Sequence, residues 1–188
     1  MREQLYFVAI LPPEELAWEI DDIRRDFSMR YGAFKALKPP VHITLKEPFK
    51  TPGTSEPYIR KYLHKASEIL KDAPVNLKDF GRFTEKVIYI DVVKSPELDA
   101  LKKEINRAFR QLSPMIEYTK PMTFNPHITI GYRDIPPDRF DIAWEEYALK
   151  TFRRSFPLQH FSLLRHDGKQ WNTIETFHTK QNNILTLF

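Results

Sequence analysis

Two short segments of the chain nearly repeat each other and carry the residue types that acid-base chemistry needs. The first is His42-Ile43-Thr44-Leu45, and the second is His127-Ile128-Thr129-Ile130. Histidine exchanges protons near neutral pH, and threonine hydroxyls donate hydrogen bonds to phosphoryl oxygens. Two such pairs meeting across a cleft could cleave a phosphodiester without a metal, because one histidine can act as base and the other as acid.

The spacing within each segment gives the pair a common direction. In a β-strand, residues i and i+2 point to the same face, so His42 and Thr44 are expected on one face while Ile43 and Leu45 are buried on the other. The second segment repeats this pattern. One unit alone is easily explained by chance, since threonine favours strands. Two nearly identical units in equivalent places favour a shared site.

The elements that must position these segments can be read from hydrophobic periodicity and from helix and turn signals. A helix is expected to open at Ser95 and to end at Ser113-Pro114. An Asp167-Gly168 turn predicts a final hairpin. The other helices are expected at 13–31, 55–71 and 136–149, and the strands at 5–11, 41–46, 75–83, 86–93, 127–130, 159–165 and 171–178.

This order uses one half twice, as strand, helix and His-x-Thr strand, and predicts an α+β fold. Helices between strands would also suit a doubly wound parallel sheet. Adjacent hairpins without crossover helices favour antiparallel sheets instead. The 188 residues suit one domain made of two similar lobes. Residues 46–58, rich in proline, are expected to form a loop that shapes the cleft.

Composition excludes several classes of protein. With no cysteine, the chain has neither disulfides nor a thiolate zinc site, which fits a reducing cytoplasm. Its five glycines form no phosphate-cradling loop of the Walker, Gly-x-Gly-x-x-Gly or Gly-x-Ser-x-Gly kinds. No apolar run is long enough for a membrane helix, and no signal peptide is recognised, so we expect a cytoplasmic protein. The net charge of +4 permits a phosphate-bearing ligand without requiring one.

The two His-Ile-Thr segments make the chain resemble the 2H phosphoesterase superfamily, and within it the 2'-5' RNA ligase or RNA 2',3'-cyclic phosphodiesterase group. The segments 6–10, 80–83, 87–90 and 125–126 add to the likeness. The resemblance implies two pseudo-symmetric α+β lobes whose antiparallel sheets face each other across a V-shaped cleft. It also implies that His42 donates a proton, that His127 accepts one from water, and that Thr44 and Thr129 hold the phosphate.

The residues after each segment depart from the group's usual pattern. Lys46-Glu47-Pro48-Phe49 stands where Phe-Leu-Gly is common, and Arg133 stands one position later than a common arginine, with Tyr132 in its place. If the strands continue, Lys46 shares the face of His42, and Arg133 that of His127. We therefore add both as candidate phosphate-binding residues.

Other polar and aromatic residues are assigned more ordinary roles. Arg165 and His166 are interpreted as solvated strand-end residues rather than cleft residues. The remaining histidines, His64, His160 and His178, have no metal-ligand spacing and are expected to be structural or exposed. Candidates for stacking on a nucleotide base are Tyr6, Phe7, Phe83, Tyr132 and Trp171.

The favoured hypothesis is a phosphodiesterase that opens 2',3'-cyclic phosphates of RNA ends or nucleotides to 2'-phosphates, with the reverse joining of 2'-5' ends as a variant. It would need no cofactor and no metal and have no membrane partner; the oligomeric state stays open, with a monomer favoured. A phosphodiesterase for another small cyclic phosphate stays open. So does a non-catalytic RNA-binding module whose His-x-Thr pairs only grip phosphate.

Overall fold

The computed structural model describes residues 3–113, 115–116 and 123–179, which form eight strands, four α-helices and two short 3-10 helices. The strands are β1 (Glu3–Ile10), β2 (Ile43–Pro52), β3 (Pro74–Phe83), β4 (Val87–Val92), β5 (His127–Gly131), β6 (Arg153–Pro157), β7 (His160–His166) and β8 (Trp171–His178). The helices are α1 (Glu14–Tyr31), α2 (Glu56–Ser67), α3 (Pro96–Gln111) and α4 (Pro137–Ala148), with 3-10 turns η1 (Lys35–Leu37) and η2 (Gly53–Ser55).

The strands form two four-stranded sheets in which every pair is antiparallel. Their orders are β2-β1-β7-β8 and β5-β4-β3-β6. The predicted α+β class with two antiparallel sheets is thereby confirmed, and the parallel alternative is wrong. The two His-x-Thr segments lie in or beside β2 and β5, which are equivalent edge strands of the two sheets. The sheets come together at these edges, where β2 contacts β5.

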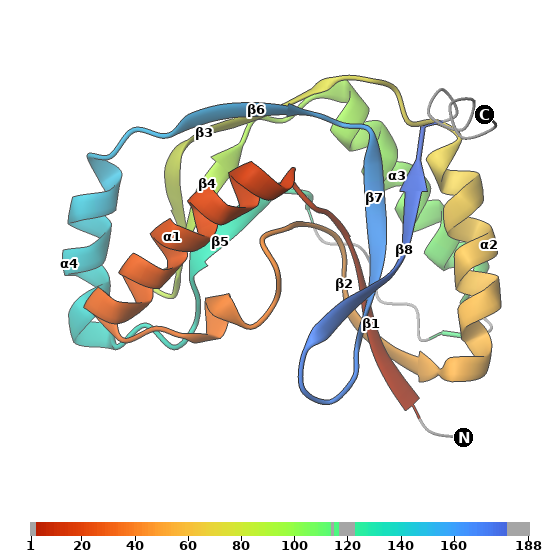
Figure 1. The fold of residues 1–188 in the computed structure, drawn as a ribbon, viewed down its shortest axis with the longest axis horizontal. Helices are drawn as coiled ribbons and strands as arrows, with labels where there is room; N and C mark the ends of the chain where they lie inside the picture. Colours follow the sequence, from red (N-terminus) through yellow and green to blue (C-terminus); the bar gives the residue numbers. More distant parts are fainter. Residues whose placement is uncertain (1–2, 114, 117–122, 180–188) are drawn as a thin grey trace.

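The helix of each repeated unit packs against the sheet that contains the other unit's His-x-Thr strand. Helix α1 connects β1 to β2 but packs against β5, and α3 connects β4 to β5 but packs against β2 and α2. Figure 1 shows this exchange, with α1 beside β4 and β5 and with α3 on the side of β7 and β8. One hydrophobic core therefore contains buried residues of both sheets, such as Leu45 of β2 and Ile130 of β5.

Local signals explain where the elements begin and end. The Ser95 side chain accepts the backbone N–H of Leu98 at 3.2 Å, which caps the first turn of α3. Helix α1 ends at Tyr31 and is capped by Gly32, whose φ of 74° suits a residue without a side chain. Helix α3 ends at Gln111, while Pro114, expected to end it, lies outside the described residues. Gly168, with a φ of 104°, makes the hairpin turn between β7 and β8.

Two expectations about the strands differ from the structure. Residues 46–52 continue β2 as a strand paired with β1, so the expected loop at 46–58 is wrong for its first half. The strand β6 was not expected, because only Phe156 of its five residues is buried and no alternation marks it. Pairing with the neighbouring β3 defines β6, and such a non-local partner is invisible to periodicity.

Candidate active site

A cavity of about 410 Å³ lies where the two sheets meet, and the four residues of the His-x-Thr pairs line it. His42 and Thr44 come from the β2 side, and His127 and Thr129 come from β5. The structure thus brings together two segments that are distant in sequence, and within each segment the histidine and its threonine line the same cavity. The alternate residues Ile43 and Ile128 are buried in the core, which fixes the direction in which the polar side chains point.

A backbone carbonyl fixes the orientation of the His42 ring. Nδ1 of His42 lies 2.7 Å from the carbonyl oxygen of Pro40. Because a carbonyl can only accept, Nδ1 carries the hydrogen and the lone pair of the neutral ring is on Nε2. The Phe7 ring packs against the imidazole at 5.0 Å between centroids. His42 therefore keeps one nitrogen, in a fixed tautomer, for a ligand in the cavity.

His127 repeats this arrangement in the other lobe. Its Nδ1 lies 2.8 Å from the carbonyl oxygen of Asn125, again two residues earlier in the chain. The rings of Phe83 and Tyr89 pack against it, at centroid distances of 4.8 Å and 5.2 Å. Both histidines consequently have the same tautomer and leave the same nitrogen, Nε2, for proton exchange. Matched geometry of this kind suits a base and an acid acting on opposite sides of one phosphorus.

Burial controls the protonation of both rings. It lowers the pKa of His42 to about 4, and the nearby charges of Arg24 and His127 act in the same direction against the Pro40 carbonyl. Burial also lowers the pKa of His127, but the Asn125 carbonyl and the carboxylate of Asp91 oppose it. Burial therefore favours the neutral form of both rings in the ligand-free site.

The two threonines supply neutral hydrogen-bond donors beside the histidines. Thr44 and Thr129 are half-buried and line the cavity. Within the described part of the chain, neither hydroxyl has a hydrogen-bond partner, so both can turn toward a bound anion. A phosphoryl group between the histidines would thus meet a donor from each lobe.

The expectation that Lys46 shares the face of His42 is wrong. Where β1 advances one residue, from Val8 to Ala9, β2 advances two, and this β-bulge interrupts the alternation. Lys46 is 7% exposed, and its Nζ lies 5.5 Å from the centre of the Phe109 ring on α3, away from the cavity. This bulge depends on how β2 pairs with β1, so it could not be predicted from the residues of β2 alone.

Arg133 does not line the cavity either. Strand β5 ends at Gly131, so the alternation on which the prediction depended does not reach Arg133. Its guanidinium instead lies over the ring of Tyr132, 5.5 Å from the centroid. Tyr132 is among the residues that line the cavity.

The aromatic candidates divide between the cavity and the core. Phe7 and Trp171 line the cavity in edge-to-face contact, at a centroid distance of 4.5 Å. Phe83 supports His127. Tyr6 is fully buried on the opposite face of β1, where its hydroxyl donates to Glu56 of α2 at 3.1 Å. Tyr6 is therefore not available to a ligand in the cavity.

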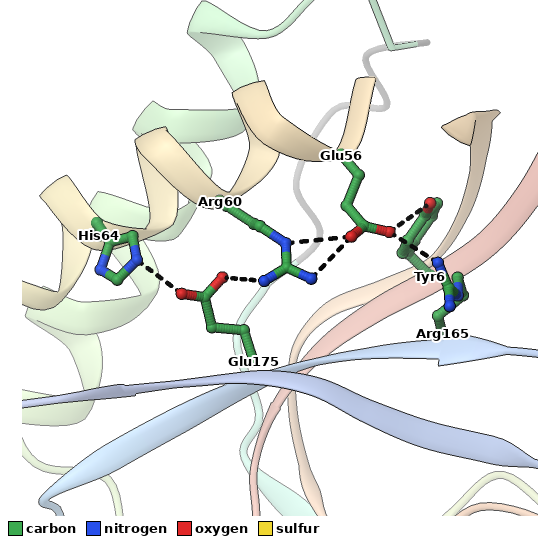
Figure 2. A network of polar contacts seen from close by, with 6 residues as sticks. All are labelled: Tyr6, Glu56, Arg60, His64, Arg165 and Glu175. Carbon is green, nitrogen blue, oxygen red and sulfur yellow. Dashed lines mark hydrogen bonds and ion pairs between the residues drawn. The ribbon is translucent and has the colours of Figure 1, made fainter. Parts of the chain in front are cut away.

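Arg165 points to the same side as Tyr6, and Figure 2 shows the polar network that it joins there. Its Nη1 donates to Glu56 at 3.0 Å, and Arg60 links Glu56 to Glu175. His64 completes the network through Glu175 at 2.7 Å. This network fastens α2 to the sheet, so Arg165 has a structural role and is not the solvated strand-end residue that the sequence analysis expected. The His166 ring packs against Trp171 at a centroid distance of 5.1 Å and is not among the residues that line the cavity.

Sequence reasoning missed the cations that do line the cavity, which are Arg24, Lys35 and Lys38. Arg24 is 2% exposed; its guanidinium donates to Asp21 at 2.9 Å and to the Pro39 carbonyl at 2.8 Å. In the sequence, Asp21 and Arg24 resemble an ordinary surface pair one helical turn apart. Only the position of α1 beside the segment before β2 reveals that Arg24 fixes the residues leading to His42.

The match to a family model is the finding that decides the relationship. The model of the 2'-5' RNA ligase superfamily matches residues 12–170, a segment that contains both His-x-Thr pairs. The chain belongs to the 2'-5' RNA ligase superfamily. This confirms the resemblance to the 2H phosphoesterases.

Relatives of this superfamily member match along nearly their whole length. Proteins of Geobacillus sp. (strain WCH70) and Bacillus cytotoxicus, both named "Putative phosphoesterase", are 30% and 31% identical to it. The alignments cover 92% and 91% of this chain, and 94% of each relative. The family and these names place the chain among phosphoesterases.

Solved structures have the same fold at low identity. A Thermus thermophilus protein, TT0787, superposes with a TM-score of 0.65 at 19% identity, covering 93% of this chain and 97% of that one. Escherichia coli LigT, solved with 3'-AMP, has a TM-score of 0.60 at 18% identity, covering 96% and 100%. Other LigT structures contain NADP+, ATP or phosphate.

In the described part of this superfamily member, no helix is long and apolar enough to cross a membrane.

Proposed function

We propose that this protein is a phosphodiesterase that opens 2',3'-cyclic phosphates of RNA ends or nucleotides to 2'-phosphates. The observation that carries the proposal is the matched pair of histidines in one cavity, each held through Nδ1 by a backbone carbonyl, at 2.7 Å for His42 and 2.8 Å for His127. Membership of the superfamily and the phosphates bound by LigT support a phosphate ester as substrate.

The proposed reaction uses one histidine for each proton transfer. The neutral histidine takes a proton from water through Nε2 while the water oxygen attacks phosphorus. The bond from phosphorus to the 3'-oxygen breaks, and the protonated histidine gives its proton to that oxygen. The products are a 2'-phosphate and a free 3'-hydroxyl, and Thr44 and Thr129 stabilise the charge on the phosphoryl oxygens during the step.

Two arguments give opposite orders for the pair. The resemblance implies that His42 is the proton donor and His127 the acceptor. The pKa of His42, lowered to about 4, favours the reverse order, because it keeps this ring in the neutral form that accepts a proton. A substrate with sulfur in place of the 3'-oxygen decides between them, since a thiolate leaves without protonation. Activity on this substrate returns only in the variant that lacks the acid.

The activity itself is tested with purified protein and 2',3'-cyclic nucleotides, with and without a chelator, while phosphorus NMR reports the position of the product phosphate. We expect 2'-phosphates, and a loss of at least about a hundredfold in kcat/KM for His42→Ala and for His127→Ala. His178→Ala is the matched control, because this histidine is exposed at the end of β8. It should keep the wild-type rate.

Two other results would replace the proposal. Turnover of a different cyclic phosphate, with these cyclic nucleotides untouched, would keep the two-histidine mechanism and change the substrate. RNA binding that persists in both histidine variants, without turnover of any cyclic phosphate, would leave a binding module whose His-x-Thr pairs only grip phosphate.

A further inference from the structure

Two lysines of the segment before β2 line the same cavity as the histidines. They are Lys35, which begins η1, and Lys38, which follows it. Both side chains are exposed, and in the described ranges no carboxylate lies within 4 Å of either ammonium group. Neither lysine is needed by the proposed proton transfers, so both are available to bind another group of the ligand.

The backbone around these lysines is held at both ends. One carboxylate oxygen of Asp134, just after β5, accepts the backbone N–H groups of Phe34 and Lys35, each at 2.8 Å. On the other side, Arg24 donates to the carbonyl of Pro39 at 2.8 Å. The segment that contains η1 is thereby tied to α1 and to the turn after β5. The backbone that carries the two lysines is consequently fixed, which lowers the entropic cost of binding an anion through their ammonium groups.

The part of the cavity that Lys35 and Lys38 line keeps a positive charge when the nearby carboxylate of Glu47 is counted. Among the described residues that line the cavity, Glu47 is the one carboxylate. It lies 3.7 Å from Nζ of Lys102 and 4.0 Å from Nζ of Lys46, two lysines outside the cavity lining, so its charge is already offset. The reacting phosphate has its own partners in the two His-x-Thr pairs. Lys35 and Lys38 are therefore surplus to one phosphate.

We propose that Lys35 and Lys38 bind a second phosphate of the substrate, attached to the 5'-oxygen of the nucleotide that carries the cyclic phosphate. This inference rests on the proposed function. The 5'-oxygen lies across the ribose from the 2' and 3' oxygens, so a phosphate there is the nearest further anion that such a substrate can offer. A cavity of about 410 Å³ has room for one nucleotide. The group is a free 5'-phosphate in a nucleotide and a phosphodiester in an RNA end.

The test measures how much a 5'-phosphate adds to kcat/KM. Adenosine 2',3'-cyclic phosphate is compared with its 5'-phosphorylated form and with a dinucleotide ending in the same cyclic phosphate. We expect the wild type to prefer both phosphate-bearing substrates by about tenfold or more, as for a charge-assisted contact. In the variant with Lys35→Gln and Lys38→Gln this ratio should fall toward one. If the wild type prefers only the dinucleotide, the second phosphate is the phosphodiester of an RNA end. If it prefers only the 5'-phosphorylated form, the second phosphate is the free 5'-phosphate of a nucleotide.

The matched control is Lys94→Gln, which changes an exposed lysine that lines a different groove and should keep the wild-type ratio. A wild-type ratio of one overturns the inference. So does an equal loss on all substrates in the double lysine variant, because the lysines would then serve the reacting phosphate. Affinities for adenosine 2'-phosphate and adenosine 2',5'-bisphosphate, measured by calorimetry, give the ratio without turnover. Absence of turnover with an intact affinity ratio would therefore contradict the proposed function and not the lysine site.

Discussion

The low pKa of His42 predicts that this ring contributes to the destabilisation of the folded chain by acid. Burial lowers the pKa from the ordinary 6.5 to about 4. Between these values the unfolded chain binds a proton on His42 that the folded chain does not. Stability must therefore fall as the pH falls through this window, and be unaffected by His42 above about pH 7.

The magnitude follows from the two pKa values. A tenfold difference in proton affinity corresponds to about 1.4 kcal/mol, so protonation of His42 costs about 3 kcal/mol more in the folded chain. Relative to pH 7, the free energy of unfolding should lose about 2 kcal/mol at pH 5 and about 3 kcal/mol at pH 4 from this residue. Carboxylates titrate in the same range, so the contribution of His42 must be isolated by difference.

Urea unfolding of the wild type and of His42→Asn, followed by tryptophan fluorescence at pH 7, 5 and 4, gives that difference. The variant should be less sensitive to acid than the wild type by about 2 kcal/mol at pH 5. Lys94→Gln, an exposed substitution, should follow the wild type at every pH. Equal acid sensitivity of the wild type and His42→Asn would refute the reasoning, because His42 would then be protonated as easily in the folded chain as in the unfolded one.

Three further predictions concern activity, packing and cooperativity. Because the pKa values of both histidines are lowered, kcat/KM should be bell-shaped with its maximum below pH 6.5, and a rate that is constant from pH 6 to 8 would contradict the acid-base pair. Lys102→Met removes the 2.6 Å hydrogen bond to the Leu45 carbonyl at the bulge of β2. Urea titration should show that the free energy of unfolding falls by about 1–3 kcal/mol, and kcat/KM should fall as well. Unchanged values would show that this bond does not hold β2 in place. We propose that residues 1–188 form one domain, because α1 and α3 pack on each other's sheets; far-UV circular dichroism and fluorescence should then give one coincident unfolding transition, and two separate transitions would contradict this.

Much of the site could be predicted from the sequence because its geometry is local. The period of two along a strand places His42 with Thr44, and His127 with Thr129, on one face each, whatever the rest of the fold does. The carbonyls that hold Nδ1 also come from residues only two positions earlier in the chain. The likeness of the two segments then indicated that the pairs belong to equivalent places. Local order of this kind is recorded in the residues themselves.

The cations of the site could not be predicted, because contacts between distant segments place them. A bulge set by pairing with β1 turns Lys46 away, and the end of β5 leaves Arg133 outside the cavity. The position of α1 buries Arg24 beside Pro39, and Asp134, just after β5, fixes the turn that carries Lys35. The sequence by itself determined the two histidine-threonine pairs and the faces they occupy. Only the tertiary structure decided which charges surround them, since a side chain's direction after a bulge or a strand end depends on partners far along the chain.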